Sequence, residues 1–187
     1  GRAEAAGVAR VAVLGLGSMG LLMLQALAVR FPGARLTGVD PLADRRALAL
    51  RLGAARTLAP EDDVAGALRA DSDGRGADLA VLTAAIPGAL GQAHALVRDG
   101  GEVLLFAAGM SAREDFATWG WYHRELRLTA SYSSTPADLR AALRLIATDR
   151  VRVAELISHR LPIEAFHEGV RLARSHQALK VYVALNP

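Results

Sequence analysis

The sequence contains no cysteine, and this absence removes several classes of protein at once. Without thiols the chain can have neither a disulfide framework nor thiolate ligands for a structural zinc ion. Lysine is almost absent as well, because Lys180 is the only lysine among 22 basic residues. The arginines are spread among 19 acidic residues, whereas a nucleic-acid-binding protein more often clusters them on one element. The composition therefore predicts no nucleic-acid partner.

Long apolar runs are also scarce. The one long uncharged run covers residues 11–29, VAVLGLGSMGLLMLQALAV, and it lies between Arg10 and Arg30. It could be a membrane span, or two elements of a soluble protein joined by a glycine-containing loop. The mean hydropathy of +0.22 is mild, and no secretory signal is visible. We therefore expect a cytoplasmic protein with no membrane partner, and interpret the run as strand, turn and helix.

Short apolar runs alternate with helical patterns along most of the chain. Alternation of this kind predicts βαβ units, hence a parallel sheet with right-handed crossovers. Six strands fit a doubly wound α/β (Rossmann) fold with the strand order 3-2-1-4-5-6. We expect strands at 11–14, 35–40, 54–58, 77–83, 102–108 and 125–132, and helices at 18–30, 43–53, from 60–63, from Pro87 to about 97, and at 136–148.

The pattern changes near residue 150. A short strand is expected at 156–161, a helix from Pro162 and a last strand at 179–185. We therefore divide the chain into a dinucleotide-binding domain, residues 1–150, and a C-terminal strand–helix–strand segment, residues 151–187.

Three glycines divide the long uncharged run into its two elements. Gly15, Gly17 and Gly20 form the pattern G-x-G-x-x-G directly after the first strand. In this pattern the first glycine makes a tight turn, the second lets the backbone approach a pyrophosphate, and the third allows close packing of helix and strand. The free N–H groups at the start of the helix, around Ser18 and Met19, would then face the phosphates. The alternative is a glycine turn without a ligand.

An acidic residue completes this fingerprint. Asp40 ends the second strand, twenty residues after Gly20. A carboxylate at this position accepts hydrogen bonds from the ribose hydroxyls of an adenosine. The alternative is that Asp40 and Pro41 only form a turn. With both halves of the fingerprint in place, the sequence predicts a dinucleotide site.

The segments VAVLGLGSMG, GVD, ADRRALALRLGA, GADLAVLTAA, ALVRDGGEVLLFA and YHRELRLTASY occur in an order that resembles the cofactor domain of the medium-chain dehydrogenase/reductase superfamily. The final segment, LISHRLPIEAFHEGVRLARSHQALKVYVAL, is most similar to the zinc-dependent sorbitol and threonine dehydrogenase branch. Family members carry a preceding catalytic domain that supplies the zinc ligands. The resemblance implies that the chain is the cofactor half, so it assigns no catalytic residue and no metal ligand here.

The resemblance also implies several cofactor contacts. Arg45 matches a basic residue beside the adenine ribose, although it could equally be a solvated arginine. Thr83 with Ala84, and Ala107, end the fourth and fifth strands, where the backbone would flank adenosine and nicotinamide. Ser131 matches the segment that meets the nicotinamide carboxamide. Lys180 matches a basic residue that reaches the pyrophosphate, with a plain surface lysine as the alternative.

The resulting hypothesis is an NAD(H)-binding domain of a zinc-dependent alcohol or polyol dehydrogenase, with NADP less favoured and zinc held only by the absent domain. The alternative function is a stand-alone nucleotide-binding or sensory module without catalysis. Trp119, Trp121 and Tyr122 precede the sixth strand, which would be a sheet edge. Because exposed edges invite pairing and aromatic residues are enriched at interfaces, we expect a homodimer or higher oligomer. The alternative is a monomer in which these aromatics pack inward and the C-terminal segment covers the edge.

Overall fold

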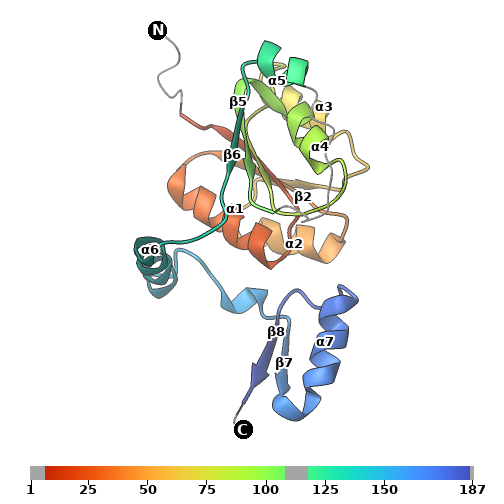
Figure 1. The fold of residues 1–187 in the computed structure, drawn as a ribbon, viewed down its shortest axis with the longest axis vertical. Helices are drawn as coiled ribbons and strands as arrows, with labels where there is room; N and C mark the ends of the chain where they lie inside the picture. Colours follow the sequence, from red (N-terminus) through yellow and green to blue (C-terminus); the bar gives the residue numbers. More distant parts are fainter. Residues whose placement is uncertain (1–6, 108–117, 186–187) are drawn as a thin grey trace. The chain divides into compact units, whose positions relative to one another are not determined.

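A six-stranded parallel sheet is the central element of the first part of the chain (Figure 1). A computed structural model describes residues 7–107 and 118–185. The strand order is β3-β2-β1-β4-β5-β6, so the predicted doubly wound topology is confirmed. The strands are β1 (Arg10–Leu14), β2 (Arg35–Val39), β3 (Arg56–Leu58), β4 (Ala77–Leu82), β5 (Val97–Leu105) and β6 (Arg127–Ala130).

Helices connect these strands. They are α1 (Ser18–Arg30), α2 (Ala43–Arg51), α3 (Val64–Ala70), α4 (Ala89–Leu96) and α5 (Thr118–His123), and α6 (Pro136–Ala147) follows the last strand. The order in which strands are added to the sheet reverses at β1, which pairs with β2 on one side and with β4 on the other. In open α/β sheets a ligand binds at such a switch point, outside the carboxyl ends of the strands.

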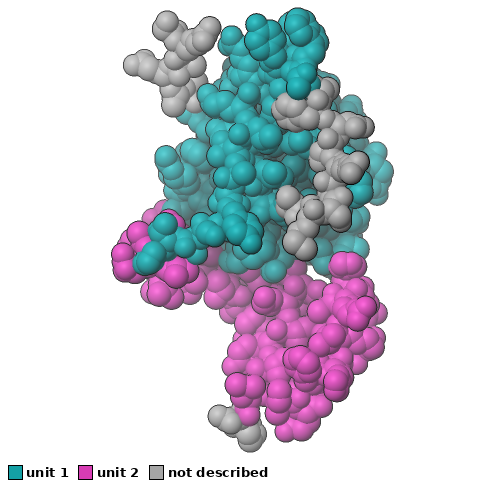
Figure 2. All heavy atoms as spheres, viewed as in Figure 1, with its two compact units in different colours: residues 1–136 teal, residues 137–187 magenta. Residues whose placement is uncertain are grey.

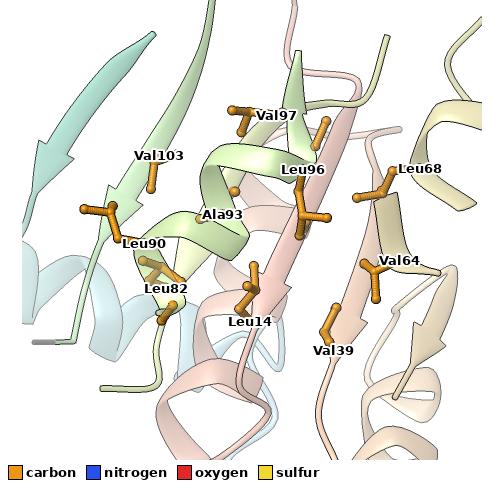
Figure 3. Packing of buried hydrophobic residues seen from close by; sticks show 14 of the residues in the cluster. Leu14, Val39, Val64, Leu68, Leu82, Leu90, Ala93, Leu96, Val97 and Val103 are labelled. Carbon is orange, nitrogen blue, oxygen red and sulfur yellow. The ribbon is translucent and has the colours of Figure 1, made fainter. Parts of the chain in front are cut away.

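The central strands are buried on both faces, as their continuous apolar sequences predict. Ala12 and Leu14 of β1 belong to a cluster with α4 residues, whereas Val11 and Val13 alternate to the opposite face and are fully buried there. Figure 3 shows the α4 side chains lying over this first face. The labelled members of the cluster are Leu14, Val39, Val64, Leu68, Leu82, Leu90, Ala93, Leu96, Val97 and Val103.

Two helices start later than the sequence suggests. The helix expected from residues 60–63 begins at Val64, because Asp63 is its N-cap and accepts a 2.8 Å hydrogen bond from the Gly66 N–H. The preceding Asp62 side chain instead accepts from the Ala59 N–H at 2.7 Å. The helix expected from Pro87 begins at Ala89, because Gly88 at the N-cap adopts a positive φ of 76°.

One carboxylate fastens the amino ends of neighbouring strands together. Asp78 accepts hydrogen bonds of 2.9 Å from the backbone N–H groups of Ala9 and Arg10, and one of 2.5 Å from Arg98 Nε. Burial raises the pKa of Asp78, but the Arg98 and backbone hydrogen bonds outweigh it and hold the pKa below its ordinary value. The charged form of Asp78 therefore stabilises the fold.

The chain separates into two compact units, Gly1–Pro136 and Ala137–Pro187 (Figure 2). The second unit contains a two-stranded parallel sheet with a helix between its strands, in agreement with the expected strand–helix–strand segment. Its elements after α6 are η1 (Ala154–Leu156), β7 (His159–Pro162), η2 (Ile163–Ala165), α7 (Phe166–Arg174) and β8 (Val181–Ala184). The functional boundary after residue 150 stays a prediction.

Across the described residues, no helix combines the length and apolar character that a bilayer crossing requires. The uncharged run at 11–29 divides into β1, the glycine turn and α1.

Candidate functional site

The predicted glycine turn lies directly beyond the carboxyl end of β1. Gly15 has a φ of +93°, in the left-handed region that side chains rarely adopt. A Cβ on Gly15 would also lie 2.9 Å from Ala84 Cβ and 3.0 Å from Thr83 Oγ1. The turn therefore needs glycine for its conformation and for the close approach of the end of β4.

The third glycine allows the start of α1 to lie against the turn. A Cβ on Gly20 would come within 1.9 Å of the Gly15 carbonyl oxygen and 2.8 Å of Thr83 Oγ1. No rotation of a flexible side chain relieves this clash, because the nearest atom belongs to the backbone. Gly20 thus performs the packing role that the sequence pattern predicts.

The first turn of α1 presents unpaired backbone N–H groups. Gly17 is the N-cap residue and offers no side-chain acceptor, and the first backbone bond of the helix runs from Leu21 N–H to Gly17 O at 2.9 Å. Among the described hydrogen bonds none satisfies the N–H groups of Ser18 or Met19. A 13-residue helix with an open N-terminus attracts an anion through these groups and its dipole. The site therefore fits a phosphate.

Asp40 lies beside this turn, at the end of β2, and is 3% exposed. One carboxylate oxygen accepts from Leu16 N–H at 2.7 Å and the other accepts from Leu42 N–H at 2.9 Å. Each carboxylate oxygen can accept a second hydrogen bond, so acceptor capacity for a ribose hydroxyl remains. The Asp40 carboxylate therefore orders the glycine turn, and its contact with a ribose hydroxyl stays a prediction.

Two arginines of α2 lie close to Asp40. Arg45 Nη1 is 3.8 Å from Asp40 Oδ2, and the same nitrogen lies 4.0 Å from the Cβ position of Gly17. Arg46 Nη1 donates instead to the backbone oxygens of Asp40 and Pro41, at 2.7 and 2.8 Å. Arg45 therefore lies beside Asp40 and the glycine turn, and its contact with an adenine ribose stays a prediction, whereas Arg46 stabilises the turn after β2.

The remaining strand ends lie along the same edge of the sheet. Thr83 N–H donates to Leu14 O at 3.0 Å, Ala107 N–H to Leu82 O at 3.0 Å, and Ser131 N–H to Leu105 O at 3.1 Å. Thr83, Ala107 and Ser131 come after β4, β5 and β6, and each donates to the end of the neighbouring strand in the sheet. Together these strand ends form a row that begins at the glycine turn. The structure thus brings the predicted residues of the first unit to one edge. Ala108, the last residue of the fifth strand expected at 102–108, lies outside the described residues.

Lys180 lies in the second unit and its residue is exposed. Its carbonyl accepts a 3.0 Å hydrogen bond from Ser158 N–H, which joins the chain before β7 to the chain before β8. The proposed contact between the Lys180 ammonium and a pyrophosphate stays a prediction.

Zinc does not fit the residues that the structure describes. They contain no group of three or more histidine or acidic side chains that could hold a metal ion. His94, for example, packs with its ring 5.4 Å from that of Trp121, and its Nε2 is buried without a hydrogen-bond partner among the described atoms. The histidines in this part of the chain thus provide no metal centre.

The sequence reasoning missed one contact of the site, the packing of Leu16 onto Gly38. Leu16, the variable residue between the first two glycines, is fully buried and packs onto Gly38 in the middle of β2. A Cβ on Gly38 would lie 2.9 Å from Leu16 Cδ2. The glycine in an otherwise regular strand was the available signal, since such a residue often marks close packing.

The sheet order and the glycine turn at the switch point define a doubly wound, nucleotide-binding fold. The sequence model of the zinc-binding dehydrogenase family matches residues 15–148, which is more than half of the chain. The chain belongs to this family.

Curated relatives of this family extend over nearly the whole chain. D-arabitol-phosphate dehydrogenase of Enterococcus avium is 25% identical over 178 residues, covering 95% of this chain and 51% of the relative. L-threonine 3-dehydrogenase of Bacillus subtilis is 26% identical over 192 residues, covering 91% of this chain and 49% of the relative. The chain thus spans about half the length of the curated relatives it matches.

A solved structure agrees with this assignment. A zinc-binding dehydrogenase of Sinorhizobium meliloti 1021, determined with bound NADP, is 27% identical and superimposes with a TM-score of 0.78. The match covers 88% of this chain and 48% of that protein. The predicted resemblance to the zinc-dependent alcohol and threonine dehydrogenases is therefore confirmed, and it concerns their cofactor-binding half.

Proposed function

We propose that the chain is the NAD(H)-binding domain of a zinc-dependent alcohol or polyol dehydrogenase. The observation that carries this proposal is the open N-terminus of α1 beside the glycine turn and Asp40. In the bound complex the nicotinamide would accept or return the hydride. This chain would supply the pyrophosphate site, the ribose contact and the orientation of the cofactor, while substrate and zinc would be held by the half that the relatives have in addition.

Direct titration tests the binding proposal. Isothermal calorimetry with NADH is expected to give one site per chain, and a Gly17→Asp variant is expected to abolish it by placing a carboxylate at the phosphate position. Gly33→Asp is a matched control, because Gly33 follows α1 and a Cβ there meets nothing within 4 Å, although its positive φ adds some strain. Wild-type protein that binds neither NADH nor NADPH would contradict the proposal.

We further propose that NAD is preferred to NADP. The Asp40 carboxylate suits a ribose diol and repels an additional phosphate. Arg45 opposes this preference, since its guanidinium lies 3.8 Å from that carboxylate and could pair with the phosphate. Arg46 is less able to do so because it is bound to two backbone oxygens.

Competing titrations of NADH and NADPH address the preference. The wild type is expected to bind NADH more tightly, and Arg45→Ala is expected to widen the difference by leaving the charge of Asp40 uncompensated. Arg51→Ala removes an exposed arginine from the C-terminal end of the same helix and serves as the control. Tighter binding of NADPH by the wild type contradicts the assignment.

We also propose that two copies associate through the β6 edge. All four residues of β6 are exposed, and Trp119 and Tyr122 nearby are 70% and 77% exposed. Trp121 differs, because it is 7% exposed and packs in the core cluster. The aromatic surface available to a partner is therefore smaller than the sequence suggested.

Light scattering at micromolar concentration tests this association. A dimer mass is expected for the wild type, and Trp119→Ala combined with Tyr122→Ala is expected to give a monomer without loss of the core. A monomeric wild type refutes the dimer, whereas a double variant that remains dimeric shows that another surface is used.

A further inference from the structure

The peptide unit between Gly15 and Leu16 is held by two side chains from different strands. Its carbonyl oxygen accepts a hydrogen bond from Thr83 Oγ1 at 2.7 Å, and its N–H donates to Asp40 Oδ2 at 2.7 Å. Asp40 follows β2 and Thr83 follows β4, the two strands that flank β1. The carbonyl and the N–H of this one peptide unit, which follows β1, are therefore held by side chains that follow β4 and β2, the strands on either side of β1.

We propose that Thr83 is a positioning residue for the dinucleotide, acting through this peptide and not by touching the phosphates. This inference rests on the proposed cofactor function. A rotation of the Gly15–Leu16 peptide would change the path of the turn and the direction of the N–H groups that follow it. The Thr83 hydroxyl opposes this rotation, because its single proton is shared between Gly15 O and Leu14 O, at 2.7 and 3.0 Å.

The same hydroxyl explains the spacing of the glycine motif. The Gly15 carbonyl oxygen points toward Gly20, where a Cβ would be only 1.9 Å away. Thr83 Oγ1 would be 2.8 Å from the same Cβ. Thr83 thus holds the Gly15 carbonyl in the position that only a glycine at 20 can accept. The order of the turn depends on a residue 68 positions after Gly15 in the chain.

Valine at position 83 keeps the shape of threonine and removes the donor. Its methyl group also needs about 3.3 Å from a carbonyl oxygen, so the Gly15 carbonyl must move away. We expect Thr83→Val to weaken NADH binding about fivefold or more, which is about 1 kcal/mol and typical of one lost hydrogen bond. Thr83→Ser restores the hydroxyl and is expected to return the affinity to within about twofold of the wild type.

A matched control separates this role from a general effect of losing a threonine. Thr148 also donates its hydroxyl to a backbone oxygen at 2.7 Å, that of Arg144, but in the second unit after α6. Thr148→Val should leave NADH affinity unchanged. Thr83→Ala removes the hydroxyl without crowding the carbonyl, so it tests the proposal if the valine variant does not fold.

The experiment combines calorimetric titration of NADH with amide hydrogen exchange at Leu16 in the ligand-free protein. The proposal expects weaker binding and faster Leu16 exchange in Thr83→Val and Thr83→Ala, with both restored in Thr83→Ser. Unchanged affinity and exchange in Thr83→Val and Thr83→Ala overturn it. If the wild type binds no dinucleotide, the cofactor function fails, and Leu16 exchange alone then decides whether Thr83 fixes the turn.

Discussion

Replacing Gly20 by alanine is the sharpest test of the glycine turn. Gly20 is within the first turn of α1 and has no positive φ, so its backbone accepts alanine without strain. The cost is steric, because the new Cβ would lie 1.9 Å from the Gly15 carbonyl oxygen, whereas such a contact requires about 3.3 Å. The carbonyl would have to move by more than about 1 Å, breaking its bond to Thr83.

Two opposing effects set the change in the free energy of unfolding that Gly20→Ala causes. Overpacking a close-packed site typically costs about 1–3 kcal/mol, and alanine returns up to about 1 kcal/mol through its higher helix propensity. Gly91 in α4 provides the matched control, since it is exposed and a Cβ there meets nothing within 4 Å. Gly91→Ala should therefore stabilise the protein by about 0.5–1 kcal/mol, while Gly20→Ala destabilises it.

Urea denaturation and NADH titration of both variants form the assay. Gly20→Ala should have a lower unfolding midpoint than Gly91→Ala and at least about tenfold weaker NADH binding, because the displaced carbonyl changes the turn that faces the phosphates. If Gly20→Ala unfolds at the wild-type midpoint and binds NADH with wild-type affinity, the described geometry of the turn is wrong.

Three further predictions concern the rest of the molecule. Asp78→Asn should lower the free energy of unfolding by about 2 kcal/mol near neutral pH. Because the pKa of Asp78 is lowered in the folded state, its contribution to stability is present above the unfolded pKa of about 3.9 and is lost as the pH falls through the folded pKa. The urea midpoints of wild type and variant should therefore converge below about pH 4. A difference between the midpoints that does not change with pH refutes the argument. Trp121→Ala should cost about 3–5 kcal/mol because Trp121 is in the core, whereas Trp119→Ala should change the melting temperature little, and equal losses contradict their different burial. Metal analysis after chelator treatment should find no tightly held zinc, and one retained ion per chain would show that the histidines were misread.

The fold was predictable because its signals are local and repeated. Apolar strands and helices alternate along the chain, and the order of a doubly wound sheet follows from right-handed crossovers. Helix starts were less predictable, since Asp62 and Asp63 have the composition of a first helical turn but precede the helix. Asp63 caps α3 by accepting from the Gly66 N–H, and Asp62 accepts from the Ala59 N–H. The sequence pattern cannot distinguish a capping carboxylate from one inside the helix.

The site was predictable in its glycines and in Asp40, because each has a fixed distance from the others along the chain. The contacts that hold the turn were not predictable in the same way. Thr83 was expected only as a strand end that flanks the cofactor, and the bond from its hydroxyl to Gly15 depends on the pairing of β1 with β4. Such a contact between distant segments leaves no periodic signal in the sequence.

The burial of Asp40 has a consequence for changing the cofactor of this domain. NADP carries a phosphate where NAD presents a ribose hydroxyl to the acidic residue after the second strand, so removing this residue would favour NADP. Here that residue also binds the N–H groups of Leu16 and Leu42. Its replacement would leave both donors unpaired beside the turn that every dinucleotide must use, at about 1–3 kcal/mol for the buried Leu16 N–H alone. Selection for a new cofactor would therefore keep Asp40 and act first on α2, where the cation Arg45 already lies at the border of the site. Changes of cofactor preference in this domain are thus easier to make on α2, while Asp40 at the end of β2 is constrained by its role in folding.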